Sequence, residues 1–183
     1  EETFNLAPAS PETMDTFVDF AQEQLVPGLG RLGARLVAAW YSDADVFAQV
    51  IHVLEFDDLA ALGSFRTRAA ADAEWASCEA RLEELAPVRR SRLMEALGPI
   101  PPEATRSAAA ESQTTPRGAY SLAILQVSPG KMPRFIAALE ASAKALPIVA
   151  SWRTIVGEQD EITDVWKGAL RQEGYQRAVE GMK

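Results

Sequence analysis

His52 is the only histidine in the chain, and its surroundings make it the first candidate for proton transfer. In QVIHVLEF, residues 49–56, the alternation of side chains predicts a β-strand with His52, Leu54 and Phe56 on one face. An imidazole titrates near neutral pH, as general acid–base catalysis requires. The residues allow such chemistry at His52, but the sequence slightly favours the alternative, a histidine that belongs to the core or its rim.

Asp164 is the second candidate, in EITDVWKG, residues 161–168. This segment also predicts a strand, with Asp164 between Ile162 and Trp166 on one face. It aligns with QVIHVLEF in an internal repeat, so that Asp164 stands at the position of His52. If both faces line one chamber, the two side chains form an opposed proton donor and acceptor, and we predict them as the catalytic pair.

Large side chains on these strands and on the strands that precede them would form the wall of the chamber. Such side chains orient an apolar substrate but take no part in proton transfer. For the tryptophans that end the preceding strands, core packing is the alternative. The predicted lining residues are Trp40, Leu54, Phe56, Trp152 and Trp166.

Other kinds of chemistry find little support in the sequence. GLGRLG, residues 28–33, has the spacing of a dinucleotide-binding loop, but that loop needs a strand before it and a helix after it, and here the order is reversed. Cys78 falls at helical spacing with Trp75 and Leu82, which predicts a buried thiol and not a nucleophile. One histidine and one cysteine leave too few ligands for haem or a metal site, so we expect no cofactor and no metal.

Composition limits the partners and the compartment. The net charge of −8 disfavours a nucleic-acid partner, because phosphate contacts need a basic face. No apolar run approaches the roughly 18 to 20 residues that cross a bilayer, and no signal peptide is visible. A single cysteine is compatible with the reducing cytoplasm. Many alanines and arginines with four lysines indicate a bacterial source.

Two parts of the chain repeat each other in order and spacing. SPETMDTFV, residues 10–18, matches SPGKMPRFI, residues 128–136. The segment LVAAWYSDADVFAQVIHVLEF, residues 36–56, aligns without a gap with IVASWRTIVGEQDEITDVWKG, residues 148–168. We interpret this agreement as a tandem duplication.

Each copy begins with a short strand that leads through Ser-Pro into an amphipathic helix. The first alignment places Phe4 over Leu122 in these strands. Ser10 and Ser128 are predicted as helix caps, since a serine side chain accepts a free backbone N–H and proline fits the first turn. Two strands follow, and then a broken helical stretch in the first copy.

The resulting element order is β-α-β-β-α-β, the ferredoxin-like unit, in a fold of the α+β class. In the first unit, residues 1–97, the segment 87–97 is predicted as one final strand. Residues 98–118 are rich in proline, serine and threonine and predict a linker. Residues 119–183 form the second unit, which lacks a counterpart to residues 73–97 and is predicted to be incomplete at its C-terminal end.

The chain resembles the NIPSNAP family, within the superfamily of dimeric α/β barrels. The resemblance rests on SPGKMPRF after the opening strand, on GARLVAAW, and on VIHVLEFDDLAA with the ADAEW that follows. It implies that the two ferredoxin-like units pack sheet against sheet and close a barrel-like cavity with the helices outside.

The resemblance leaves two classes of function open. The first is a cofactor-independent biosynthetic enzyme, of the polyketide cyclase, isomerase or monooxygenase type, that acts on an apolar small molecule in the barrel. The alternative is a non-catalytic ligand-binding or oligomerisation module, for which a homodimer is the simplest assembly. The sequence inclines towards the enzyme and names no substrate.

Overall fold

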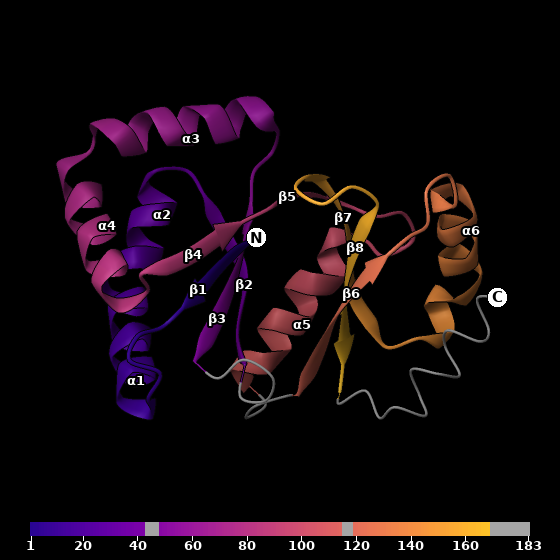
Figure 1. The fold of residues 1–183 in the computed structure, drawn as a ribbon, viewed down its shortest axis with the longest axis horizontal. Coiled ribbons are helices and arrows are strands. Elements are labelled where there is room, and N and C mark those ends of the chain that lie inside the picture. The colour runs from indigo at the N-terminus through magenta and orange to yellow at the C-terminus, as the bar shows by residue number, and fades with distance from the viewer. Residues whose placement is uncertain (43–47, 115–118, 169–183) are drawn as a thin grey trace. The chain divides into compact units, whose positions relative to one another are not determined.

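The computed structural model describes residues 1–42, 48–114 and 119–168 (Figure 1). The fold is α+β, as predicted, and its contacts divide the chain into two compact units, Glu1–Ser91 and Arg92–Lys183. Each unit contains a four-stranded antiparallel sheet. The prediction of a sheet-to-sheet barrel concerns the placement of one unit against the other and stays a prediction.

The first unit has the element order expected of a ferredoxin-like unit, β-α-β-β-α-β, with both helical stretches divided. Its sheet has the strand order β2-β3-β1-β4, so that β1 and β3 are central. The elements are β1 (Glu2–Asn5), α1 (Pro11–Phe20), η1 (Ala21–Leu25), α2 (Val26–Arg31), β2 (Arg35–Ser42), β3 (Gln49–Glu55), α3 (Leu59–Ala71), α4 (Ala73–Leu85) and β4 (Val88–Ser91).

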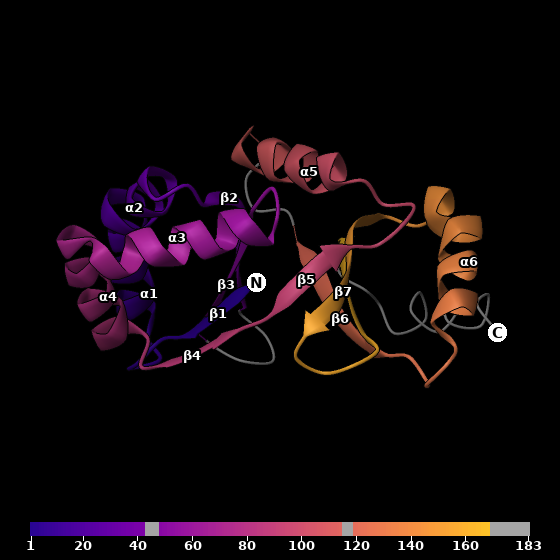
Figure 2. The ribbon, with the colours of Figure 1, turned by 90° about the horizontal axis from the view of Figure 1, so that it is seen from above.

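The core of the first unit lies between the sheet and α1, α2 and α4, which cover one face of it (Figures 1 and 2). Aromatic rings fill the space between the layers because flat side chains bury much apolar area on a sheet. Phe4 of β1 and Phe17 of α1 are each 1% exposed, and their ring centroids are 5.6 Å apart. Burial of this face decides which residues of β3 become part of the core.

Local signals place the helices of the first unit. Ser10 caps α1 as predicted, since its Oγ accepts the Thr13 backbone N–H at 3.2 Å. Asp58 and Asp72 cap α3 and α4 in the same way, with the N–H of Ala61 and Trp75 as donors at 2.7 Å. The glycines of GLGRLG lie in α2 and in the turn before β2, so the helix precedes and the strand follows, as predicted.

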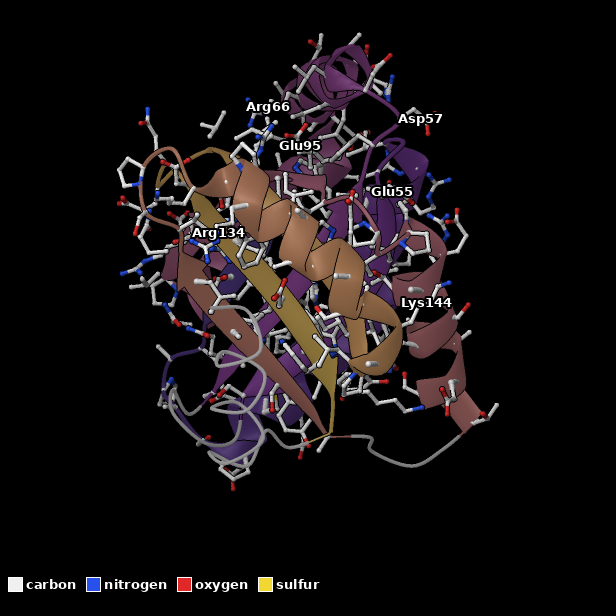
Figure 3. All side chains as sticks on the ribbon, turned by 90° about the vertical axis from the view of Figure 1, so that its right-hand side faces the viewer. Glu55, Asp57, Arg66, Glu95, Arg134 and Lys144 are labelled. Carbon is white, nitrogen blue, oxygen red and sulfur yellow. The ribbon has the colours of Figure 1, made fainter. Side chains whose placement is uncertain are left out.

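The second unit contains the sheet β5-β7-β8-β6. In Figure 3 α6 crosses in front of β6 and β8, and Arg134 lies on its exposed side. The core beneath α6 includes Leu139, Ile162 and Trp166. The elements are β5 (Leu93–Ala96), α5 (Pro102–Thr114), β6 (Tyr120–Gln126), α6 (Met132–Ser142), η2 (Ala143–Ala145), β7 (Ile148–Val156) and β8 (Glu161–Lys167).

The predicted final strand, residues 87–97, is two strands. Val88–Ser91 pairs with β1 in the first sheet, and Leu93–Ala96 pairs with β7 in the second. Side-chain pattern indicates an extended chain but not its pairing partner, so a strand that changes sheets has no local signal.

The predicted linker, residues 98–118, is also corrected where the structure describes it. Residues 102–114 form α5, which packs along β7 with Thr105 and Ala108 buried. The Thr105 hydroxyl donates to the Val149 carbonyl at 3.0 Å. Small side chains let this helix approach the strand closely, so it needs no large apolar residue. The predicted incompleteness of the second unit falls on residues 169–183, outside the described residues.

The central strand pairs of the two units share one register. Leu36 pairs with Leu54 and a β-bulge follows, and Ile148 pairs with Trp166 and a bulge follows at the same step. This agrees with the alignment of residues 36–56 with residues 148–168.

The alignment of the first strands is wrong by three residues. Phe4 pairs with Val50, whereas the residue that pairs with Ile162, the counterpart of Val50, is Leu125 and not Leu122. Only five positions separate Val127 from Met132 of α6, against eight from Leu6 to Met14 of α1. The connection between the first strand and its helix is therefore three residues shorter in the second unit, which an alignment without gaps does not show.

The shortening has two consequences in the second unit. Ala123 and Leu125 face the core, while Leu122 and Ile124 are 37% and 55% exposed on the other face. Ser128 does not cap α6 as predicted, because α6 begins only at Met132 with no side-chain cap.

Gly33 gives a test of the turn that joins α2 to β2. Its φ of 86° is left-handed, and an added Cβ would lie 2.6 Å from the Arg68 guanidinium. We expect Gly33→Ala to lower the free energy of unfolding by roughly 1–2 kcal/mol or more. Gly30→Ala is the matched control, since nothing lies within 4 Å of its added Cβ, and it should stabilise α2 by about 0.5–1 kcal/mol. Urea unfolding of both variants checks this, and equal effects would contradict it.

Candidate functional site

His52 lies in the aromatic core of the first unit. Its ring centroid is 5.1 Å from that of Phe4 and 6.0 Å from that of Phe17 on α1. The side chain is 2% exposed, and no hydrogen-bond partner for its Nδ1 is found among the described residues. Burial lowers the pKa of His52 to about 4, so the ring is neutral at neutral pH.

This placement corrects the predicted orientation of His52. The prediction put its strand face towards a chamber between sheets, whereas that face is covered by the helices of its own unit. Alternation along a strand separates two faces but does not say which one the helices cover.

Asp164 lies in the corresponding position of the second core. It is 1% exposed, and the Ser151 hydroxyl donates to its Oδ1 at 2.6 Å. Its neighbours on the strand face, Ile162 and Trp166, belong to the cluster beneath α6. Asp164 therefore also faces its own helix layer, and the predicted opposition to His52 across a shared chamber is wrong for the same reason.

The pKa of Asp164 is raised to about 6. Burial is the larger cause, since it penalises the carboxylate, and the Ser151 hydrogen bond works against it. The group changes charge near neutral pH, and of the two predicted catalytic residues it is the one whose pKa suits proton transfer.

Ser151 is the polar partner that the sequence prediction missed. It stands opposite Asp164 on β7, and its counterpart on β2, Ala39, stands opposite His52. The alignment of residues 36–56 with residues 148–168 contained the signal, because the two segments differ at both members of this cross-strand pair.

The five predicted lining residues divide between two sheet faces. Leu54 and Phe56 pack against the first core, and Trp166 is 3% exposed in the second. Trp40 and Trp152 lie on the opposite faces, paired with Ile51 and Thr163. The bulge before each tryptophan sets its side, so these residues do not form one wall.

Two further buried polar atoms have no hydrogen-bond partner within the described ranges. One is Trp166 Nε1, on the same face as Asp164, and the other is Thr163 Oγ1 on the opposite face. Cys78 is 5% exposed, and burial raises its pKa to about 11, so the thiol is protonated and buried as predicted.

In residues 1–42, 48–114 and 119–168, no three His, Cys, Asp or Glu side chains are grouped to hold a metal ion. Over the same ranges, no helix combines the length and apolarity needed to cross a membrane.

Part of the chain is similar to a known protein family. The family model described as NIPSNAP matches residues 8–95. Among solved structures, a crystal structure of an uncharacterized NIPSNAP domain protein from Burkholderia xenovorans is 20% identical, with a TM-score of 0.43. The match covers 49% of this chain and 83% of that chain. No curated protein matches the sequence.

Asp164 makes the stability of the second unit depend on pH. Its folded pKa lies above the ordinary value, so the folded state binds the extra proton and stability falls as pH rises from about 4 to about 6. We expect Asp164→Asn to raise the free energy of unfolding by on the order of 1–3 kcal/mol at pH 7.5 and to change it little at pH 4. Urea unfolding at both pH values tests this. Glu140→Gln, exposed on α6, is the control, and an equal effect at both pH values would contradict the prediction.

His52 has the opposite pH dependence. Its folded pKa lies below the ordinary value, so the unfolded state binds the extra proton and stability is lost as pH falls from about 6.5 to about 4. We expect His52→Leu to be about as stable as the parent protein at pH 7 and more stable, by on the order of 1–3 kcal/mol, at pH 4. Thermal unfolding across this range measures the difference. An unchanged pH dependence in the variant would rule out the neutral, buried imidazole.

Proposed function

We propose that the protein, whose residues 8–95 match the NIPSNAP family model, is a non-catalytic association module whose second unit pairs with a second copy of the chain through β6. The first unit is the complete ferredoxin-like scaffold, and the second carries the contact surface. The observation that carries the proposal is that β6 is the last strand of the second sheet within the described residues.

The outer edge of β6 corresponds to the edge of β1 that pairs with β4 in the first sheet. In the first sheet β4 pairs with β1, whereas β6, the counterpart of β1, pairs only with β8 in the part of the chain that the structure describes. The edge segment YSLAILQ has no charge and no proline, the usual devices against edge-to-edge pairing. Its exposed face presents Leu122 and Ile124. An uncharged, apolar edge of this length favours strand pairing.

The sequence of β6 fits a second copy of itself. The strand runs from Tyr120 to Gln126 and is centred on Ala123. Antiparallel pairing about a two-fold axis at Ala123 brings Leu122 opposite Ile124 of the other copy, so four aliphatic side chains meet on one face. Each copy carries a net charge of −8, and this uncharged strand allows the two to approach without like charges at the contact.

The catalytic alternative has weaker support. A general acid or base must touch the substrate, and His52 and Asp164 are 2% and 1% exposed within the helix-side cores of their own units. Asp164, with its pKa near 6 and its Ser151 partner, is the better of the two candidates. Access for a substrate would require the core beneath α6 to open.

The tandem arrangement forms part of the same proposal. We infer that the second unit is a repeat of the first, supported by the shared register and bulge of the central strand pairs. A further support is the turn before β3 and β8, where Ala48 and Asp160 both have a φ of 58°. Their carbonyls accept from the N–H of Leu6 and Val127, each at 2.9 Å.

Analytical ultracentrifugation of the full chain tests the association. We expect the parent protein to dimerise and Ile124→Lys to be monomeric with an unchanged circular dichroism spectrum, because residue 124 is 55% exposed and its change removes no core contact. Ile155→Lys, at a residue 43% exposed on β7, is the matched control and should still dimerise. A monomeric parent protein, or a dimer that survives Ile124→Lys, would show that β6 is not the contact.

The register has a separate test. Facing residues of antiparallel strands have Cα atoms about 4.5–5.5 Å apart, within the range of a disulfide. We therefore expect Ala123→Cys to form a disulfide-linked dimer under mild oxidation, and Gln126→Cys, at the end of the strand, to form far less. Peptide mapping identifies the linked residue. Equal cross-linking at both positions would contradict pairing centred on Ala123.

A further inference from the structure

A cavity of about 200 Å³ lies among the helices of the first unit. It is bounded by η1, by α2 and by the start of α4. Trp75, Cys78 and Gly28 contribute its apolar wall, and Glu23, Glu74 and Arg31 contribute charged groups. The proposed association through β6 does not involve this part of the chain.

The backbone beside the cavity is irregular. Residues Ala21–Leu25 form a π-helical stretch, in which the Val26 N–H reaches back five residues to the Ala21 carbonyl. Such stretches are rare in proteins, and they occur frequently at functional sites. Glu23 of this stretch lines the cavity.

The indole of Trp75 is held firmly in place. The Trp75 side chain is 8% exposed and its backbone N–H is fixed by Asp72. Phe65 packs edge-on against the indole, with ring centroids 6.0 Å apart. Gly28 lets α2 approach the indole, since an added Cβ would lie 3.1 Å from indole Cε3.

The charges around the cavity leave an excess of carboxylate. Arg31 donates to both carboxylate oxygens of Asp72, and this hydrogen bonding is the main reason that the pKa of Asp72 is lowered to about 2. Arg31 is also 3.2 Å from Glu74. Because Asp72 already balances the single positive charge, Glu23 and Glu74 make the rim negative. Cys78 is a neutral thiol and adds apolar surface.

We propose that this cavity binds a small organic cation, an ammonium group on a short apolar chain. The carboxylates of Glu23 and Glu74 attract the ammonium group, and the indole offers both apolar surface and cation–π attraction. An anion is disfavoured because Arg31, the one cationic side chain among the described residues that line the cavity, is engaged by Asp72 and Glu74. The volume equals that of roughly six or seven water molecules, which limits the ligand to a few heavy atoms.

Nuclear magnetic resonance titration of the ¹⁵N-labelled full chain tests the site, with n-butylammonium as the probe and 1-butanol as its uncharged counterpart. Saturable shifts of the Trp75 indole N–H and of backbone amides in residues 21–28 and 73–78 are expected with butylammonium. Shifts that do not saturate, or that butanol reproduces at the same concentrations, would overturn the proposal.

The carboxylates are tested by the double variant Glu23→Gln, Glu74→Gln. Both side chains are exposed, so the fold should be unchanged. We expect butylammonium to bind roughly tenfold more weakly to the double variant than to the parent protein. Each lost carboxylate should account for about half of the change in binding free energy. Glu83→Gln, exposed on α4 and outside the cavity, should bind as the parent protein does. Equal affinity of all three proteins would overturn the proposal, whatever the association state.

Discussion

Burial of one face of each sheet beneath its own helices is the constraint on which the remaining features depend. Side chains alternate along a strand, so once the face with Phe4 and Val50 is covered by α1, every second residue of β3 enters the core. The same holds for β8, where Ile162 and Trp166 are covered by α6. A titratable residue at such a position meets an apolar surrounding whatever its chemistry. This burial shifts the pKa values of His52 and Asp164. Groups that can contact a partner or a ligand therefore lie at sheet edges and on helix surfaces.

His52 and Asp164 show how one position can have opposite electrostatic consequences. Burial disfavours the charged form of each group, so it lowers the pKa of the imidazole and raises that of the carboxyl group. Their contributions to stability therefore change in opposite directions over the same pH range. The cross-strand neighbour differs accordingly, because Ser151 can donate to a carboxylate whereas Ala39 offers His52 nothing. The two aligned strand pairs therefore differ at both facing residues and not at a single position.

The sequence allowed much of the scaffold to be predicted. The α+β class, the cap at Ser10, the buried thiol of Cys78 and the helix-then-strand order around GLGRLG rested on local patterns, and the structure agrees with them. The partition of residues 87–97 between two sheets was out of reach, since pairing partners are set by distant strands. The site prediction failed at its geometry: it identified the strand faces of His52 and Asp164 but assigned them to the wrong side.

What the sequence determined by itself is periodic or local: most of the strands and helices of the first unit, which residues share a face, and that residues 36–56 and 148–168 have the same pattern. The tertiary structure decided which face the helices cover, that Ser151 reaches Asp164, and that β6 is shifted by three residues so that Leu122 and Ile124 are exposed. The physical reason is that periodicity follows from backbone geometry within a few residues. Coverage, register and edge exposure arise from contacts between segments far apart in the chain, which local spacing does not record.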